Sequence, residues 1–248
     1  MLTLQGRTMV ITGGAGNNGL AIVRSVIEQG MNVAFFSSSL KKGQGAVDAL
    51  EPEYRAHAVG LSADESGYDA ALAAVAARFG SVDVLVNAAG PHESFPLEDT
   101  DEARYDGNQR LLKTAFFTVR HALPYLERSR AARIINLTTA EGRQGGWRPA
   151  AAQACARGGL ISLTYALARE LGGRGITANC VCIAPIEGDV PAHDTLPDDA
   201  RARLTAMTPL GRLGEPRDIV SAVEFLASEE SAFVTGAVID VSGGLVMG

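Results

Sequence analysis

A glycine-rich run near the start of the chain has residue types and spacing suited to binding phosphate. The run Gly13-Gly14-Ala15-Gly16-Asn17-Asn18-Gly19 follows an apolar stretch and leads into a segment with a helical pattern. In such a turn, backbone N–H groups can approach a pyrophosphate while the helix N-terminus contributes partial positive charge. Close packing of a helix on a strand could also explain the glycines. We expect Gly13, Asn17, Asn18 and Gly19 to border a phosphate site.

A second short motif, Asn87-Ala88-Ala89-Gly90, follows the apolar run from Val82 to Val86. If the runs before both motifs are parallel strands, their carboxyl ends lie at the same edge of one sheet. The second motif would then lie where a cofactor bound at the glycine-rich turn would extend. Asn87, Ala88 and Gly90 are therefore further candidate cofactor contacts.

The elements that must position these motifs alternate along the chain. Apolar, β-branched runs recur between Ala- and Leu-rich segments of helical period. The candidate strands are Thr8 to Ile11, Asn32 to Phe36, His57 to Gly60, Val82 to Val86, Arg133 to Leu137, Ile176 to Ile183 and Val238 to Val241. The main candidate helices are Leu20 to Gln29, Tyr68 to Phe79, Arg104 to Leu126, Ala150 to Leu171 and Pro216 to Ala227. This order predicts a single doubly wound α/β domain of Rossmann type over residues 1–248, with a seven-stranded parallel sheet and helices on both faces.

The segment from Ile186 to Leu210 breaks this alternation, because it is rich in Pro, Asp and Thr. Such a composition favours a loop over a regular element. We expect it to form a loop and lid over a cleft, with the lid at about residues 186–215.

Composition and charge limit the kinds of partner. The formal net charge is −6 and the longest basic run is Lys41-Lys42, so neither nucleic acid nor a membrane surface is an expected partner. No apolar run approaches the roughly 20 residues of a membrane span, and no signal-peptide pattern precedes the first strand. The expected location is cytoplasmic. Cys155, Cys180, Cys182 and the four histidines lack metal-ligand spacing, so no metal site is expected.

The chain resembles the short-chain dehydrogenase/reductase family over nearly its whole length. Its first turn is similar to the family pattern T-G-x-x-x-G-x-G, and Asn87 to Gly90 is similar to N-A-A-G. Arg133 to Leu137 resembles the strand that carries the family's serine, while Pro209 to Pro216 and Thr235 to Gly244 resemble its last third. The resemblance implies hydride transfer with a dinucleotide cofactor. It also implies four catalytic positions: a tyrosine as general acid, a lysine four residues later, a serine and an asparagine.

Two of those four positions carry residues that cannot perform the family's proton transfer. Aligning Gly158 to Thr164 with the segment after the lysine puts Gln153 at the tyrosine position and Arg157 at the lysine position. Glutamine has no titratable proton, and arginine stays protonated at neutral pH. The serine position falls on Thr138 or Thr139. The degenerate site implied by the resemblance comprises Asn108, Thr139, Gln153 and Arg157.

The cofactor-binding part also departs from the family. Asn17 replaces a fingerprint glycine, and Asn18 replaces a small apolar residue. The run Ser37-Ser38-Ser39 offers neither an acid for a ribose 2′-OH nor an arginine for a 2′-phosphate, although Lys41 or Lys42 could reach one. Leu61 and Ile186 replace a family aspartate and a family glycine. We therefore expect NAD(P) to bind weakly or not at all at this remnant site, which includes Ser37.

A different reaction at the same site is a second hypothesis. The candidate residues for it are Thr139, Glu141, Arg148, Gln153, Cys155, Arg157, Asp189 and His193. Arg157 could clamp a carboxylate or a phosphate, but it could also form a structural ion pair that fills the lysine position. This hypothesis predicts an atypical NAD(P)-dependent oxidoreductase or a non-redox enzyme. A small-molecule-binding regulator is a third possibility.

The helices Arg104 to Leu126 and Ala150 to Leu171 carry apolar residues on more than one face, which indicates burial on two sides. The corresponding helices form a dimer contact in the family that the chain resembles. We expect a dimer or tetramer through helices 104–126 and 150–171, formed with itself or with a homologous active short-chain dehydrogenase. The leading hypothesis is a non-catalytic subunit, similar in pattern to the inactive partners in two-subunit complexes that oxidise hydroxyacyl-CoA.

Overall fold

The computed structural model describes residues 4–62, 67–88, 90, 94–146, 149–187 and 198–247. Seven strands form one sheet in the order β3-β2-β1-β4-β5-β6-β7, and every adjacent pair is parallel. The strands are β1 (Thr8–Thr12), β2 (Asn32–Ser37), β3 (Ala58–Ser62), β4 (Val84–Asn87), β5 (Arg133–Thr139), β6 (Thr177–Ile183) and β7 (Val238–Val241). The strand order reverses between β1 and β4, so the expected doubly wound α/β fold is confirmed.

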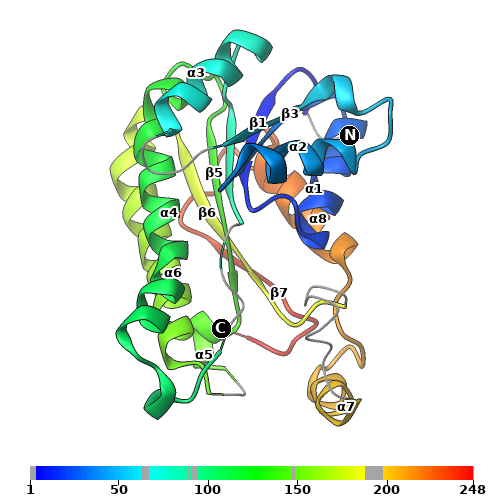
Figure 1. The fold of residues 1–248 in the computed structure, drawn as a ribbon, viewed down its shortest axis with the longest axis vertical. Coiled ribbons are helices and arrows are strands. Elements are labelled where there is room, and N and C mark those ends of the chain that lie inside the picture. The colour runs from blue at the N-terminus through cyan, green and yellow to red at the C-terminus, as the bar shows by residue number, and fades with distance from the viewer. Residues whose placement is uncertain are drawn as a thin grey trace.

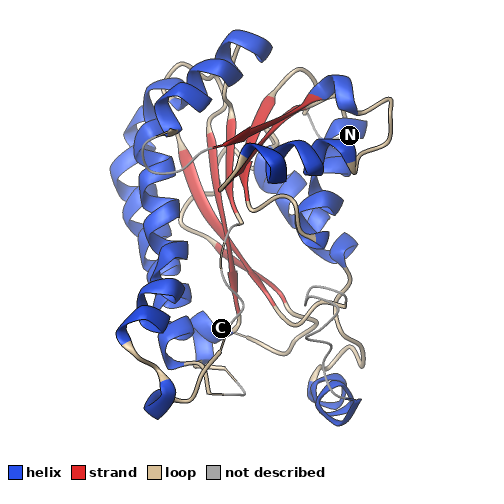
Figure 2. Ribbon diagram, viewed as in Figure 1, coloured by secondary structure: helices blue, strands red, loops and turns tan. Residues whose placement is uncertain are grey.

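Helices cover both faces of the sheet (Figures 1 and 2). On one face lie α3 (Tyr68–Phe79), α4 (Glu102–Leu126) and α6 (Ala151–Leu171). On the other lie α1 (Asn17–Glu28), α2 (Leu40–Asp48) and α8 (Pro216–Ala227). The short helix α5 (Glu141–Gln144) directly follows β5, and α7 (Asp198–Met207) lies towards the same end of the molecule. Single 3₁₀ turns occur at Arg55–His57, Leu97–Asp99 and Gly172–Arg174.

The hydrophobic core has two parts because the sheet is covered on both sides. One cluster packs α1, α2 and α8 against the sheet and includes Ile22 and Ile135. The other packs α3, α4 and α6 against the opposite face and includes Leu72 and Ile134. Neighbouring residues of β5 thus enter opposite clusters, as the alternation of side chains along a strand requires.

Helix α7 corrects one expectation from the sequence. It lies within the segment Ile186 to Leu210, so the prediction of a loop is wrong for Asp198–Met207. Its first turn carries Asp198 and Asp199, and acidic side chains stabilise a helix N-terminus. Residues 188–197 of the predicted lid lie outside the described residues, and the lid stays a prediction.

Candidate functional site

The first βα turn has a backbone that suits phosphate binding. Gly13 has a φ of 71°, in the left-handed region that favours glycine. A Cβ on Gly19 would lie 2.5 Å from the Cα of Gly14, so α1 packs on the turn too closely for a side chain. The N-cap residue Gly16 has open space where its Cβ would be, and Asn17 is exposed. The N-terminus of α1 is therefore accessible to a phosphate.

Hydrogen bonds hold the second motif beside that turn. The Ala88 N–H donates to the carbonyl oxygen of Thr12 at 3.1 Å, which ties the end of β4 to the end of β1. Asn87 Nδ2 donates to Asn136 Oδ1 at 2.8 Å, and Asn136 Nδ2 donates to Thr164 Oγ1 at 2.9 Å. These bonds connect β4 through β5 to α6. Ala89, in the middle of the motif, lies outside the described residues.

Three elements carry the four positions that the family resemblance singles out. We call Asn108 on α4, Thr139 at the end of β5, and Gln153 and Arg157 on α6 the strand-end site. Thr138 Oγ1 donates to the Arg157 carbonyl oxygen at 3.0 Å. A Cβ on Gly142 would lie 2.6 Å from the Arg157 carbonyl carbon, so α5 is in close contact with α6. The end of β5 therefore abuts the turn of α6 that carries Arg157.

The Arg157 side chain lies beside the end of β4. It is only 4% exposed, and a Cβ on Gly90 would lie 3.5 Å from its Nη2 atom. The same Cβ would lie 3.0 Å from Leu111 Cδ1 of α4. The glycine at position 90 therefore leaves room for both the guanidinium and α4.

Gln153 and Asn108 are tied together through their neighbours in sequence. Gln109 Nε2 donates to the Ala152 carbonyl oxygen at 3.1 Å, which joins α4 to α6 at this level. Both Gln153 and Asn108 are 5% exposed. The start of α6 and the second turn of α4 therefore present two buried amides to one region.

Three side-chain oxygens of the strand-end site are buried without a hydrogen-bond partner among the described residues. They are Gln153 Oε1, Thr139 Oγ1 and Asn108 Oδ1. Asn108 Nδ2 donates to the Arg104 carbonyl oxygen at 3.1 Å. Amides and hydroxyls can donate and accept hydrogen bonds, but they have no acid to release near neutral pH. The four side chains can therefore bind and orient a polar group.

Comparisons with known proteins agree with this architecture. A family model described as enoyl-(acyl carrier protein) reductase matches residues 14–246. The 3-oxoacyl-[acyl-carrier-protein] reductase FabG of Vibrio cholerae serotype O1 is 34% identical over 247 residues, covering 99% of this chain and 100% of the relative. FabG of Escherichia coli strain K12 is 32% identical with the same coverage. A crystal structure of a short-chain dehydrogenase/reductase, glucose/ribitol dehydrogenase from Brucella melitensis, matches with a TM-score of 0.86 and 27% identity over 98% of both chains.

The chain belongs to the short-chain dehydrogenase/reductase family. Membership agrees with the resemblance expected from the sequence. The family assignment does not itself test the roles of Asn108, Thr139, Gln153 and Arg157, which stay predictions.

The residues of this short-chain dehydrogenase/reductase fit the pyrophosphate of a nicotinamide dinucleotide better than the ribose on its adenine side. The glycines of the first turn would hold its pyrophosphate. At the end of β2, the Ser37 hydroxyl donates to the Ser39 carbonyl oxygen at 2.7 Å, and the Ser39 hydroxyl accepts from the Lys42 N–H at 3.3 Å. Both hydroxyls are therefore engaged within the loop. The exposed Lys41 and Lys42 are the charged groups nearest in sequence to a ribose at this position.

The side chain of Ile186 points into the core. It is buried in the cluster on the α8 side of the sheet, and its Cδ1 lies 2.3 Å from where a Gly214 Cβ would be. The Glu187 N–H donates to the Gly214 carbonyl oxygen at 2.8 Å. The absence of a side chain at Gly214 therefore makes room for the isoleucine that replaces the family glycine.

The structure describes two of the other candidate residues for a different chemistry. Glu141 begins α5, and Cys155 is exposed on α6. Arg148, Asp189 and His193 lie outside the described residues. Burial raises the pKa of Cys180 to about 12, and burial together with Asp240 raises the pKa of Cys182. Neither buried thiol is therefore available as a thiolate at neutral pH.

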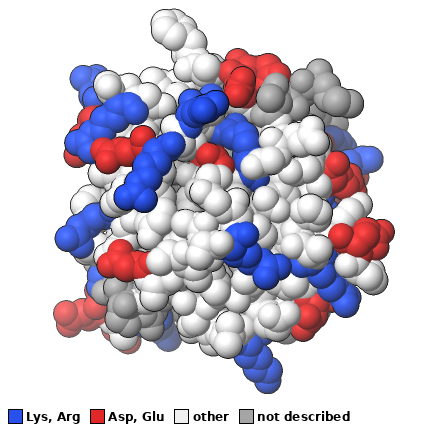
Figure 3. All heavy atoms as spheres, turned by 90° about the horizontal axis from the view of Figure 1, so that it is seen from above, with Lys and Arg blue, Asp and Glu red and all other residues white. Residues whose placement is uncertain are grey.

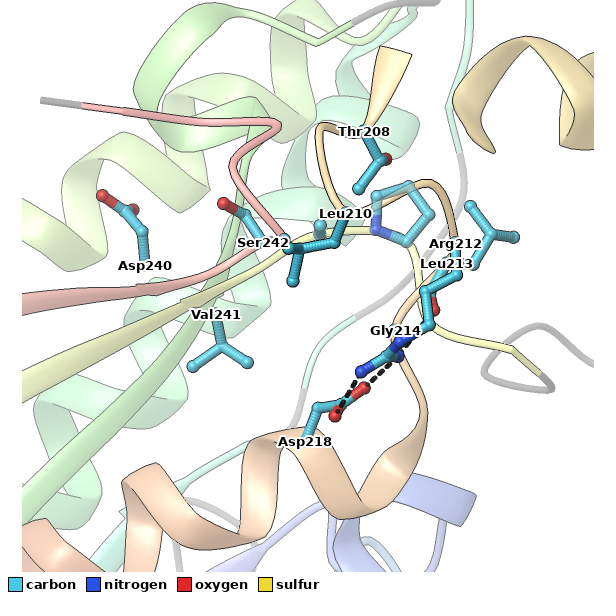
Figure 4. A pocket seen from close by; sticks show the side chains of 12 residues that line it. Thr208, Leu210, Arg212, Leu213, Gly214, Asp218, Asp240, Val241 and Ser242 are labelled. Atoms are coloured by element: carbon cyan, nitrogen blue, oxygen red, sulfur yellow. Dashed lines mark hydrogen bonds and ion pairs between the residues drawn. The ribbon is translucent and has the colours of Figure 1, made fainter. Parts of the chain in front are cut away.

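A pocket of about 250 Å³ that the sequence did not reveal lies at the ends of β6 and β7 (Figure 4). Its lining is formed by Ala184, Pro185, Thr208, Leu210, Arg212, Leu213, Gly214, Asp218, Asp240, Val241, Ser242 and Gly243. Figure 4 shows Arg212 joined to Asp218 and the Asp240 carboxylate pointing away from that ion pair. The strand-end residues do not line this pocket. The one sequence feature that marks this pocket is the pair Gly243-Gly244 after β7. Both glycines have positive φ, and Gly243 lines the pocket.

Acidic and basic side chains are mixed on the face of the molecule that Figure 3 shows. Figure 3 views the molecule from above, at the end opposite α5 and α7, and shows basic and acidic side chains interspersed among uncharged residues. Within the described ranges, no helix is both long and apolar enough to cross a membrane. Across the same residues, no group of three His, Cys, Asp or Glu side chains could hold a metal ion.

Proposed function

We propose that this short-chain dehydrogenase/reductase is a non-catalytic subunit that pairs with an active NAD(P)-dependent dehydrogenase of the same family. The observation that carries the proposal is Gln153, buried on α6 one turn before Arg157. Carbonyl reduction needs a proton donor, and general acids work best with a pKa near the operating pH. An amide has no such proton, and a guanidinium does not tune a neighbouring acid by giving up its own.

The outer faces of α4 and α6 support the pairing. Phe116 on α4 is 50% exposed and Tyr165 on α6 is 43% exposed. Large aromatic side chains are enriched at protein interfaces because they bury much area at a small cost in conformational entropy. The two helices are packed tightly, since a Cβ on Gly159 would lie 2.7 Å from Leu112 Cδ2. They therefore offer a firm surface to a second subunit.

An atypical enzyme is the second candidate function. It is favoured by the accessible first turn, with Gly13 in the left-handed region, and by relatives named as reductases. A nicotinamide dinucleotide, when bound, supplies or accepts the hydride. Thr139 and Gln153 would orient the substrate by hydrogen bonds, and the proton would have to come from solvent. The names of the relatives make a 3-oxoacyl thioester the substrate class to assay.

Isolation of the chain from its native host tests the pairing directly. The chain is tagged at its own locus, and native mass spectrometry gives the composition of the complexes. We expect the tagged chain in a fixed ratio with a second short-chain dehydrogenase that has both the tyrosine and the lysine. A chain found only with copies of itself would contradict it.

Restoring the missing pair tests the assignment of the two positions. Gln153→Tyr with Arg157→Lys is assayed by NADPH oxidation with a 3-oxobutyryl thioester, beside each single variant. If the remnant cofactor site is as eroded as proposed, the double variant stays within about tenfold of background. A larger recovery of activity would show that the cofactor site is intact and favour the second candidate.

A further inference from the structure

The strand-end site contains more hydrogen-bonding capacity than its own residues use. Gln153 Oε1, Thr139 Oγ1 and Asn108 Oδ1 are all shielded from solvent without a partner among the described residues. A buried acceptor left unpaired destabilises the folded state, so native proteins rarely keep one without a reason. Three such oxygens in one region indicate a ligand that brings hydrogen-bond donors.

Chain geometry places these oxygens around one buried cation. Gln153 precedes Arg157 by four residues, so both side chains lie on the same face of α6. Asn108 precedes Leu111 by three residues on α4, and both Leu111 and Arg157 border Gly90. Thr139 follows Thr138, whose hydroxyl bonds to the Arg157 backbone. The three oxygens therefore belong to the surroundings of Arg157.

The charge and polarity of this region select among ligand classes. An ammonium group brings only donors, so it cannot accept from the Gln153 amide nitrogen, and its charge has the same sign as the buried Arg157 guanidinium. A ketone or a carboxylate brings only acceptors, so neither can satisfy Gln153 Oε1. A neutral group with adjacent donor and acceptor can satisfy a side-chain amide with two reciprocal hydrogen bonds.

We infer that the strand-end site binds a primary carboxamide, with the ligand NH₂ donating to Gln153 Oε1 and the ligand carbonyl accepting from Gln153 Nε2. Thr139 and Asn108 supply further polar contacts around the same head group. The inference goes beyond the proposed subunit role, and it rests on that proposal only in treating residue 153 as a binding group. Binding involves no bond making or breaking.

Three probes that share one alkyl chain test this ligand class on the full chain. Hexanamide, hexanoate and 2-heptanone differ only in the head group, and their affinities are compared by saturation-transfer NMR. Hexanamide is expected to bind about tenfold more tightly than either of the others, the difference that one additional net hydrogen bond gives. Equal or tighter binding of hexanoate or 2-heptanone, or no binding of hexanamide, overturns the inference.

Variants show whether Gln153 is the origin of the preference. Gln153→Leu is expected to bring the three affinities within about twofold of one another, and Thr139→Val serves as a second variant that keeps the side-chain shape. Gln44→Leu is the matched control, because Gln44 is exposed on α2 and should leave the order unchanged. A preference for hexanamide that survives Gln153→Leu overturns the inference. NADPH oxidation with 2-heptanone is measured separately, because turnover would contradict the subunit role without changing the order of binding.

Discussion

At the scale of single residues, the unpaired amide oxygen of Gln153 has a consequence for stability. Replacing Gln153 by leucine removes a buried Oε1 atom that has no partner among the described residues and keeps a similar side-chain volume. Gln153→Leu should therefore raise the free energy of unfolding by about 1 kcal/mol. Urea denaturation measures this difference. The exposed Gln44→Leu is the control and should change it by less than about 0.5 kcal/mol. A clear loss of stability in Gln153→Leu would mean that the amide is already satisfied.

Sequence patterns identify residues of this site but not their environment. The motifs alone pointed to Gly13, Asn87 and Gly90, and the family resemblance pointed to Gln153 and Arg157. Burial of the Gln153 amide without a partner depends on α4, α5 and β5 meeting α6, contacts that join residues far apart in the chain. The turn of Ile186 into the core depends in the same way on Gly214, nearly thirty positions later in the sequence.

At the scale of elements, α2 packs closely on β3 because Gly43 of the helix faces Gly60 of the strand. A Cβ on Gly43 would lie 2.9 Å from the Leu61 backbone nitrogen, whereas a Cβ on Gly45 of the same helix would meet nothing within 4 Å. Gly43→Ala should therefore cost about 2 kcal/mol of stability through overpacking. Gly45→Ala should stabilise by about 0.5–1 kcal/mol, because alanine favours a helix more than glycine does. Thermal unfolding of both variants checks the pair, and equal effects would contradict close packing of α2 on β3.

An ion pair at the start of α8 is expected to make the stability of the fold depend on pH. Arg212 donates to both carboxylate oxygens of Asp218 at 2.7 and 2.9 Å, and this contact lowers the pKa of Asp218 from its ordinary value of 3.8 to about 2. The stabilisation is complete above pH 4 and is lost as the pH falls through about 2, because the folded state keeps the carboxylate ionised longer than the unfolded state does. Solvent screening of the half-exposed Arg212 keeps this stabilisation small.

Asp218→Asn should therefore be less stable at neutral pH and should lose less stability between pH 4 and pH 2. Urea denaturation across that range makes the comparison. Asp106→Asn on the exposed face of α4 is the control. Parallel pH profiles for wild type and Asp218→Asn would show that the ion pair contributes nothing.

Elements with strong periodic patterns were predictable, and those with conflicting signals were not. The bounds of α3 and α8 agree with the sequence pattern because each has an apolar stripe and one clear end signal. Helix α3 stops at Gly80, which is left-handed, and α8 starts with a proline and a capping box. Helix α2 went unpredicted because Gly43 and Gly45 give it low intrinsic helix propensity, and its stability comes from packing on β3. Helix α7 was not predicted because the run before it is rich in Pro and Asp, residues that favour loops.

At the scale of the whole molecule, the doubly wound fold follows from the alternation of strands and helices, but the choice of partner does not. The same outer faces of α4 and α6 could bind a second copy of this chain or a different chain. The surface of one subunit therefore does not identify its partner.

A charge placed on the outer face of α4 is expected to weaken association between subunits. Phe116→Arg should weaken association at least about tenfold, because it puts a charge where an aromatic side chain would be buried. Analytical ultracentrifugation of the chain, alone and with the partner isolated from its host, measures this. Leu40→Arg on α2 is the control, since Leu40 is 60% exposed on the opposite side of the sheet. Equal effects of the two substitutions would contradict an interface on α4 and α6.

The absence of a general acid is the central claim, and the turnover of the isolated wild-type chain tests it most directly. NADPH and NADH oxidation is followed with a 3-oxobutyryl thioester, using a purified chain shown to be free of partner. The expected rate is no higher than that of the reaction without protein. A steady rate on the order of 1 s⁻¹, within the ordinary range for enzymes, would contradict it.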